Sequence, residues 1–517
     1  MPDETLSSFN TNEKLIERIM KYAEAKQIMI AKDALQLLDG NNYIDIINYA
    51  DEKGAFVISK ETIDTILKEH PEINKPKKEK EETHTLPTEI LKSIHIPALD
   101  NESNLFIPKD GYNNGDKEYK CDISDFNEYF ISKFKELKKI LMLHRNVSPI
   151  SSKALKFTKE GDSVCLIGMV NEKRTSKKGN AVISLDDLDG EFKIIITQNG
   201  KLKDFDKQII LDDVIAVQGT FLGNGIVIAE EIEYPSTTNK VMKKAKRDLN
   251  LLVTSDLHIG SKLFYEDMFK DFIDWLNAKN VSNEEREEIH KIKYIILNGD
   301  LVDGIGVYPQ QLSELNIIDI NEQYEILADY LMQIPEYIDI IIGPGNHDAV
   351  RLADPQPVIP KQFAKKLYGM KNVHMVGSPT RLQIEDLNVL MYHGTSMNTM
   401  QFQLKLDPTK AELAMEEYLK RRTLSPVYGA RHITAPDKDG LMIIKQEPDI
   451  FITGHIHSNA YKQVNGCLTI NPGCWQAQTV YQKEQGHTPT PGHVPIVRLN
   501  KGTYFEKVFK SSMKIDD

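Results

Sequence analysis

Polar residues end five apolar segments in the C-terminal half of the sequence. The first, LLVTSDLHIG at residues 251–260, ends in Asp256 and His258. Side chains two positions apart in an extended chain point the same way, so this aspartate and this histidine could bind one ion together. A loop aspartate beside a solvent-exposed histidine would give the same sequence pattern. The pair alone therefore leaves both the metal-binding and the solvent-exposed interpretation open.

Four later segments repeat this pattern, each with glycine beside polar residues. YIILNGDLVDG, DIIIGPGNHDAV, VLMYHGTS and DIFITGHIHSN supply Asp300 and Asp303, then Asn346, His347 and Asp348, then His393, and finally His455 and His457. Glycine permits a sharp backbone turn, and sites in α/β folds form at the carboxyl ends of strands. We therefore expect the five segments to converge on one site.

The side chains at these strand ends offer carboxylate and amide oxygens and imidazole nitrogens, but no thiolate. Such a set suits manganese, magnesium, iron or zinc and argues against a structural cysteine-rich zinc site. The predicted ligands are Asp256, His258, Asp300, Asn346, His393, His455 and His457. They exceed the needs of one tetrahedral ion and predict two neighbouring ions, which together clamp a phosphoryl group. Asp300 is the expected bridge because a carboxylate has two oxygens to share.

The elements that must position these residues form several regions. From residue 249 onward apolar strands alternate with helical stretches, which indicates an α/β layered fold. Residues 155–235 carry five short β segments separated by turns, and these predict a small closed barrel of the oligonucleotide-binding type. Near the N-terminus, helical spacing predicts a small bundle, with Ser59 as the N-cap of one helix.

We expect five regions along the chain. They are a helical interaction module at 1–72, a flexible linker at 73–110, a helical connector at 111–150, the barrel at 151–240 and the α/β domain at 249–510. The linker prediction rests on NKPKKEKEETHTLP, which has mixed charge, two prolines and almost no apolar residues.

The composition excludes several classes of protein. A net charge of −12 argues against a protein that coats nucleic acid by bulk electrostatics, although local basic stretches can still bind it. We expect no membrane association, because no apolar stretch is long enough to span a bilayer and the N-terminus is polar and acidic. The four cysteines contain no C-x-x-C pair and predict reduced thiols in a cytoplasmic protein.

Two basic segments are candidate contacts to DNA phosphates. The loop between the first two barrel strands carries Lys173, Arg174, Lys177 and Lys178, and the segment RRTLSPVYGARH carries Arg421, Arg422 and Arg431. Such residues contact the nucleic-acid backbone in many complexes. A solvated hairpin in a protein-binding barrel and a solvated basic loop are equally consistent with these sequences.

The order D-x-H, G-D-x-x-D, G-N-H-D, H-G and G-H-x-H over residues 250–500 resembles the calcineurin-like metallophosphoesterase superfamily. The resemblance implies a two-layer β-sandwich flanked by helices. It implies that one ion is held by Asp256, His258, Asp300 and His457 and the other by Asp300, Asn346, His393 and His455. It also implies that His347 protonates the leaving oxygen, while Asp303 and Asp348 orient ligands.

A helical module, a barrel and then this domain resemble, over nearly the whole chain, the small subunits of archaeal family D DNA polymerases. The distinctive pieces are TSDLHIGSKLF, LNGDLVDGIGVYP, GPGNHDAVRLADPQP and ITGHIHSN. This resemblance implies a proofreading 3′→5′ exonuclease with two divalent ions, manganese first and magnesium, iron or zinc as alternatives. It also implies a heterodimer with a large catalytic subunit, DNA with 3′ ends as substrate, and contact with a sliding clamp through the holoenzyme.

Three other functions are weighed against the exonuclease. A protein phosphatase of the same superfamily is disfavoured because Gly304 stands where G-D-x-V-D-R-G has arginine. A double-strand-break repair nuclease has similar motifs, but the barrel upstream of the domain counts against it. A non-catalytic scaffold subunit would not need the complete ligand set, which the related B subunits of eukaryotic replicative polymerases have mostly lost.

Overall fold

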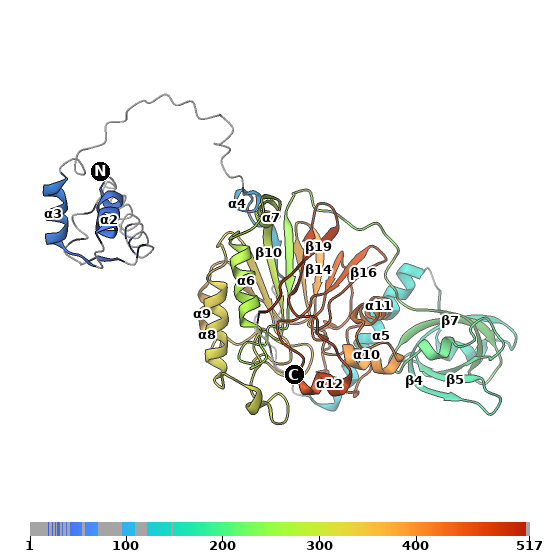
Figure 1. The fold of residues 1–517 in the computed structure, drawn as a ribbon. Helices are drawn as coiled ribbons and strands as arrows, with labels where there is room; N and C mark the ends of the chain where they lie inside the picture. The colour runs from blue at the N-terminus through green and yellow to red at the C-terminus, as the bar shows by residue number, and fades with distance from the viewer. Residues whose placement is uncertain are drawn as a thin grey trace, which may run out of the picture. The chain divides into compact units, whose positions relative to one another are not determined.

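The protein forms two compact units, Met1–Ser93 and Ile94–Asp517, drawn as a ribbon in Figure 1. The computed structural model describes residues 19, 23, 26, 28–30, 34, 38, 42–53, 57–70, 96–108, 121–145 and 148–512. Within these ranges, every helix is too short or too polar to cross a bilayer.

The described part of the first unit contains two helices and a short sheet. The strands β1 (Met29–Ile30) and β2 (Val57–Ile58) pair in parallel, and the helices are α2 (Tyr43–Glu52) and α3 (Lys60–Glu69). The side chain of Ser59 accepts a hydrogen bond from the Thr62 backbone at 3.2 Å, so the predicted N-cap is confirmed. The rest of the predicted module lies outside the described residues.

Two six-stranded sheets form the centre of the second unit. The first sheet has the order β12 (Val373–Met375), β11 (Asp339–Gly343), β10 (Ile292–Asn298), β9 (Asn250–Thr254), β18 (His493–Arg498), β19 (Thr503–Val508). The second has the order β16 (Ala460–Val464), β17 (Cys467–Asn471), β15 (Ile450–Ile452), β14 (Leu387–Met391), β13 (Thr380–Ile384), β3 (Leu105–Phe106). Strands β9–β12 pair in parallel, as do β14, β15 and β17.

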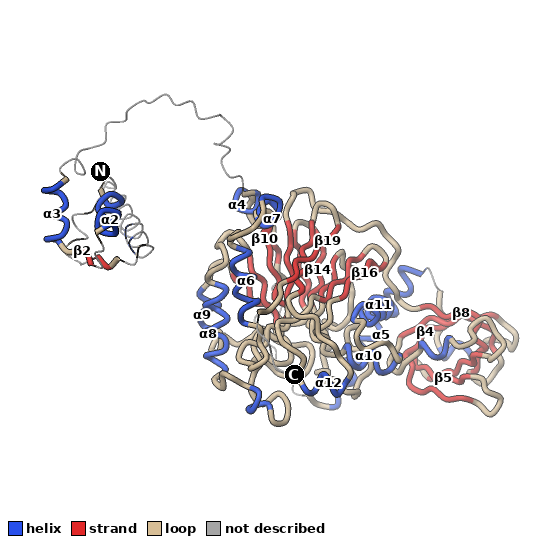
Figure 2. Tube along the Cα trace, in the orientation of Figure 1, coloured by secondary structure: helices blue, strands red, loops and turns tan. Residues whose placement is uncertain are grey.

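The two sheets pack face to face, and helices cover their outer faces. Val253 and Ile296 of the first sheet share one buried core with Val389 and Ile452 of the second. Because both faces of β9 and β10 are covered, every residue of these strands is buried and most are apolar. The predicted two-layer β-sandwich flanked by helices is confirmed, and its layers are visible in Figure 2.

Helices cover the outer face of each sheet and bury apolar side chains against it. The first sheet is covered by α6 (Glu266–Leu276), α7 (Asn283–Ile289), α8 (Ile320–Leu331) and α9 (Lys365–Gly369), and the second by α10 (Met397–Leu404) and α11 (Ala411–Arg421). In α6, Phe269, Phe272, Ile273 and Leu276 are buried at helical spacing. The remaining helices of this domain are α4 (Pro97–Asp100), α12 (Val480–Gln485) and the 3-10 turn η5 (Gln311–Glu314).

The predicted barrel is confirmed as a closed five-stranded structure. Its strands are β4 (Ser163–Thr175), β5 (Ala181–Asp186), β6 (Glu191–Ile196), β7 (Val214–Phe221) and β8 (Ile226–Glu233), in the order β4-β5-β6-β8-β7. The 3-10 turns η3 (Ser152–Phe157) and η4 (Phe205–Gln208) flank them. Helix α5 (Ile123–Arg145) packs on the barrel, where Phe134 and Leu141 contact a core with Ile167 and Val214.

The predicted linker at 73–110 is wrong for its described part, residues 96–108. There, α4 docks on the α/β domain, where the backbone of Ala98 donates to His290 at 3.0 Å, and β3 pairs with β13 through Leu105 opposite Ile384. These are tertiary contacts that a local composition does not reveal. Residues 71–95 lie outside the described residues, and the other region boundaries stay a prediction.

Candidate metal centre

The five polar segments meet at one end of the two sheets. They follow β9, β10, β11, β14 and β15, whose carboxyl ends lead into the loops that Figure 2 shows gathered at this end. His258, after β9, lies with its Nε2 atom 3.1 Å from Nε2 of His457, after β15. Asp300, after β10, has its Oδ2 atom 3.2 Å from Nε2 of His393, after β14. The predicted convergence is confirmed.

The backbone at these strand ends is held in a sparsely populated conformation. Five of the predicted ligands, none of them glycine, have φ between 48° and 71°: Asp256, His258, Asp300, His455 and His457. Each such residue costs on the order of 1 kcal/mol, and surrounding hydrogen bonds retain it. Asp256, for example, receives the backbone N–H of Trp475 on its carbonyl at 3.0 Å and donates its own to Gly299 at 3.0 Å. Strain of this kind marks a backbone shaped to aim its side chains.

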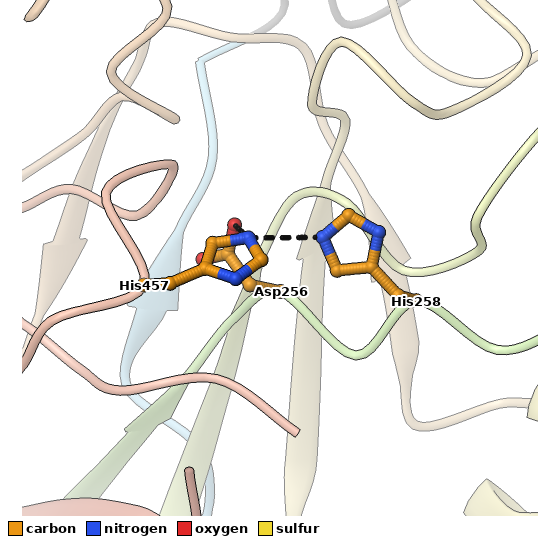
Figure 3. A group of neighbouring side chains, drawn as sticks. All are labelled: Asp256, His258 and His457. Carbon is orange, nitrogen blue, oxygen red and sulfur yellow. Dashed lines mark hydrogen bonds and ion pairs between the residues drawn. The ribbon is translucent and has the colours of Figure 1, made fainter. Parts of the chain in front are cut away.

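The first group of ligands is Asp256, His258 and His457, whose ligand atoms have the spacing of a metal site. Figure 3 shows the two imidazole rings facing each other, with the carboxylate of Asp256 beside His457. Nε2 of His457 lies 3.3 Å from Oδ1 of Asp256. On the outer sides, Nδ1 of His258 lies 3.0 Å from Asp303, and Nδ1 of His457 lies 2.8 Å from the side-chain amide of Gln482. These contacts fix both rings so that their Nε2 atoms face inward.

The second group is Asp300, His393 and His455. The Nδ1 atom of His393 is 2.8 Å from the carbonyl of Asn298, which turns Nε2 towards Asp300. Oδ2 of Asp300 also lies 3.8 Å from Nε2 of His258 in the first group. Asp300 thus stands between the two groups, where a bridging carboxylate would have to be.

Two buried atoms at the second group make no hydrogen bond within the described residues. They are Oδ1 of Asn346 and Nε2 of His393, whose 3.2 Å contact with Asp300 is an ion pair. An unsatisfied buried polar atom costs about 1–3 kcal/mol, so folded proteins rarely contain them. A divalent ion would satisfy both, because amide oxygen and imidazole nitrogen are both ligands of such ions. The residues present therefore fit a metal ion.

Glycine next to the site makes room for a carboxylate. A Cβ atom on Gly345 would lie 2.2 Å from Oδ1 of Asp300, far inside van der Waals contact. The same carboxylate oxygen accepts the backbone N–H of His347 at 2.8 Å. Only glycine at position 345 lets the loop after β11 approach Asp300 this closely.

Charges within the site oppose the effect of burial. Burial would raise the pKa of Asp300, but the imidazoles of His393 and His347 hold it well below the usual range of an aspartate. Burial would lower the pKa of His393, but the charge of Asp300 raises it to about 10. Burial lowers the pKa of His455 to about 3. Without an ion the site thus pairs an ionised Asp300 with a protonated His393, and a metal ion bound by His393 would displace that proton because a ligating imidazole is neutral.

His347 lies beside the ligands without belonging to either group just described. Its Nδ1 atom is 2.8 Å from the backbone carbonyl of Asp303, and its ring meets that of His258 edge-on with centroids 4.6 Å apart. It lines a cavity of about 280 Å³ together with His258, Asp300, Asn346, His455 and His457. The ligand atoms of His258, Asp303 and His347 also lie close enough together to hold a metal ion.

The two remaining predicted residues, Asp303 and Asp348, bind side chains and backbone groups next to the predicted ligands. Asp303 accepts from the side chains of Gln311 at 2.9 Å and Gln476 at 3.1 Å while it contacts His258. Asp348 accepts the backbone N–H of Gly345 at 2.8 Å and the Tyr324 hydroxyl at 2.8 Å. Burial raises the pKa of Asp348 to about 7. The first carboxylate holds a histidine ring, and the second closes the turn that carries Asn346.

The rest of the cavity is lined by residues that sequence reasoning missed. They are Val307, Tyr308, Glu314, Asn398, Ile456, Gln476, Thr479, Tyr481, Gln482 and His487. Thr479 and Gln482 form the capping box of α12, a T-x-x-Q spacing that could have located this helix. The spacing contains no signal that Gln482 reaches a metal ligand, because that contact joins segments 25 residues apart.

Comparisons with known proteins identify the family. The DNA polymerase alpha/epsilon B-subunit family matches residues 251–462. The DNA polymerase II small subunit of Methanothermobacter thermautotrophicus is 38% identical over 386 residues, which cover 74% of this chain and 78% of that protein. That of Methanocaldococcus jannaschii is 37% identical over 420 residues, or 79% and 70%. The chain belongs to the family of archaeal DNA polymerase II small subunits.

This member of the DNA polymerase II small-subunit family carries an α/β domain of two packed six-stranded sheets, with buried histidine and aspartate groups whose ligand atoms have the spacing of metal sites. A solved structure described as a novel archaeal phosphodiesterase covers 50% of this chain at 17% identity, with a TM-score of 0.26.

Two arginines predicted to contact DNA in this family member are buried, and the prediction for them is wrong. Arg421 donates to Asp213 of the barrel at 2.9 Å, and 1% of its side chain is exposed. Arg422 donates to the carbonyl of Ile444 at 2.6 Å and pairs with Glu447 at 3.0 Å. Their donors are occupied inside the protein, so they cannot reach a phosphate. Arg421 instead joins the barrel to α11.

The other basic residues proposed to contact DNA lie away from the lining of the metal cavity. Arg174, Lys177 and Lys178 are exposed on the first barrel hairpin. Lys173 points back and donates to the carbonyl of Ile209 at 3.2 Å. Arg431 is exposed and stacks on Phe402, with 4.7 Å from its guanidinium carbon to the ring centroid. For these five residues, DNA contact stays a prediction.

Proposed function

We propose that the protein is the 3′→5′ exonuclease subunit of a replicative DNA polymerase and removes mismatched nucleotides by metal-dependent phosphodiester hydrolysis. Its relatives are named small subunits of DNA polymerase II, and a small subunit requires a large one. We infer that the partner is the large polymerising subunit, in a heterodimer that reaches a sliding clamp as a holoenzyme. DNA with 3′ ends is the proposed substrate, and a cytoplasmic location stays a prediction.

The observation that carries this proposal is the pair of buried ligand groups that meet at Asp300. We assign one ion to Asp256, His258, Asp300 and His457, and the other to Asp300, Asn346, His393 and His455. Manganese is proposed first, with magnesium, iron or zinc as alternatives, because the ligands are oxygen and imidazole nitrogen. Bound there, divalent ions would polarise a phosphoryl group and would activate the attacking water.

His347 is proposed as the general acid. The carbonyl of Asp303 accepts from its Nδ1 atom at 2.8 Å, which steadies the protonated ring and leaves Nε2 as the nitrogen that can give a proton. Because the residue lines the cavity beside Asn346, this proton can pass to the 3′ oxygen that leaves. Asp303 and Asp348 are proposed to hold His258 and the turn with Asn346 in place.

The test is hydrolysis of a 3′-mismatched primer by the purified chain in Mn²⁺, alone and with its large subunit. We expect shortening from the 3′ end, which a label at the 5′ end reveals as a ladder. Asp300→Asn should lose bound metal and activity together. His347→Ala should keep bound metal but lose activity, and His374→Ala, a histidine that pairs with Asp339 outside the site, should retain both.

Two results would overturn parts of this proposal. A protein that binds no divalent ion and degrades no DNA would be a scaffold, the alternative function. Full activity in His347→Ala would remove that histidine from the chemistry but leave the ion assignment intact.

A further inference from the structure

The cavity has one wall made by α12, and this helix is coupled to the metal ligands. Gln482 of α12 contacts Nδ1 of His457 at 2.8 Å, and its capping box with Thr479 fixes the start of the helix. Tyr481 precedes Gln482 and lines the same cavity, although 62% of the residue is exposed. In Figures 1 and 2, α12 lies at the end of the sheets where the strand-end loops gather.

Tyr481 leaves its aromatic ring exposed at the cavity. A buried tyrosine usually serves packing, whereas an exposed aromatic ring at the mouth of a polar cavity is available to a ligand. Tyr308, the other tyrosine of the lining, is engaged: its hydroxyl donates to Glu314 at 2.8 Å. The carboxylate of Glu314 also repels phosphate from that part of the lining. The approach of a nucleic-acid strand is therefore favoured along α12.

The size of the cavity limits how DNA can enter. A volume of about 280 Å³ is that of a pocket for a single small ligand. A terminal nucleotide must leave the duplex before its phosphate can reach Asp300 and the other buried ligands. Leaving the duplex costs stacking and pairing energy, and it costs least for a mismatched end. An aromatic ring at the entrance can replace the stacking that the base gives up.

We propose that Tyr481 stacks on the base of the 3′-terminal nucleotide and thereby selects unpaired ends. This inference rests on the proposed exonuclease function and adds the contact that distinguishes a frayed end from a paired one. Because every base has a π face, Tyr481 confers preference for an unpaired base without preference for its identity. Mismatch selection then follows from the lower cost of fraying and needs no recognition of the mismatch itself.

The first experiment compares two single strands that end in either a normal nucleotide or an abasic site. We expect the wild-type protein in Mn²⁺ to have a KM about 10-fold lower for the strand with a terminal base, since stacking on an aromatic residue contributes a factor of this order. Tyr481→Ala should lose this preference, and Tyr481→Phe should keep it because it retains the ring. Val480→Ala, the exposed neighbour on the same helix, is the matched control and should keep it too.

The second experiment does not depend on hydrolysis. A strand with 2-aminopurine at its 3′ end and a phosphorothioate at the terminal linkage is titrated with each variant in Mg²⁺. Stacking quenches the fluorophore, so the wild type and Tyr481→Phe should quench it and Tyr481→Ala should not.

The outcomes separate this inference from the proposed function. Quenching that requires the aromatic ring, in a protein that cleaves no DNA, would support stacking and refute the exonuclease. Cleavage with an unchanged base preference in Tyr481→Ala, or quenching that survives this substitution, would overturn the stacking role.

Discussion

Replacing Arg421 by alanine tests whether this arginine joins two domains or binds DNA. Its guanidinium donates to Asp213 at 2.9 Å and lies over the ring of Tyr234, with 5.0 Å from its carbon to the centroid. Both partners belong to the barrel end of the structure, whereas Arg421 ends α11 of the α/β domain. The substitution therefore removes the ion pair that bridges the two parts.

The magnitude follows from what Arg421 leaves behind. Breaking a buried ion pair by removing one partner costs about 3–5 kcal/mol, because the remaining charge is buried without compensation. Asp213 would keep two donors, the backbone of Ile210 at 3.0 Å and the hydroxyl of Tyr234 at 3.1 Å. Because these partly satisfy the carboxylate, we expect the lower end, a loss of about 3 kcal/mol in the free energy of unfolding.

The assay is urea denaturation followed by circular dichroism, together with DNA affinity at several salt concentrations. Asp213→Ala and the double variant complete a thermodynamic cycle, in which we expect a coupling energy of at least about 1 kcal/mol. Arg431→Ala is the matched control: this exposed arginine should change unfolding by less than about 0.5 kcal/mol. If Arg421→Ala left stability unchanged and instead weakened DNA binding with a reduced salt dependence, the structural role assigned to Arg421 would be refuted.

Four further results are expected. Gly345→Ala should abolish tight metal binding, measured by calorimetry, because its Cβ would lie 2.2 Å from Asp300; retention of two tight ions would contradict the close approach. Gln482→Ala should weaken metal affinity about 10- to 100-fold by releasing His457, and unchanged binding would show that the contact is incidental. Added Mn²⁺ at about 100 times its Kd should stabilise the fold by about 2.7 kcal/mol for each ion bound, and a chelator should reverse the resulting increase in Tm. Burial lowers the pKa of His432 to about 4, so the unfolded chain takes up its proton first as the pH falls. The contribution of His432 to stability is then complete above pH about 6.5 and is lost towards pH about 4, by up to about 3 kcal/mol. His432→Gln should flatten the dependence of unfolding free energy on pH in that window. An equally steep dependence in the variant would refute the assignment.

The convergence of the candidate site was predictable from sequence because its predicted ligands follow strands, and strand ends are local signals. Asp256 and His258 stand directly after an apolar run, and the same holds for His455 and His457. Parallel pairing brings such ends to one edge of a sheet. Spacing along the chain therefore carried the spatial information that mattered.

Other features depend on contacts between distant segments and leave no local trace. Arg421 and Arg422 read as a basic loop, but their partners Asp213 and Glu447 come from other segments of the chain. The end of the predicted linker docks on the α/β domain because β3 pairs with the edge of the second sheet at β13. Only the three-dimensional structure shows that Tyr481 and His457 line the same cavity.

The hydrogen bonds around Asp256 give the protein an intrinsic optical reporter. Trp475 donates its backbone N–H to the Asp256 carbonyl at 3.0 Å and its indole N–H to Thr254 at 2.7 Å. The sequence contains two tryptophans, and both Trp275 and Trp475 lie in the core beneath the first sheet. A divalent ion held by Asp256 would place charge beside the backbone segment that Trp475 contacts. Occupancy of the site should therefore be readable as a shift in emission from the unlabelled protein.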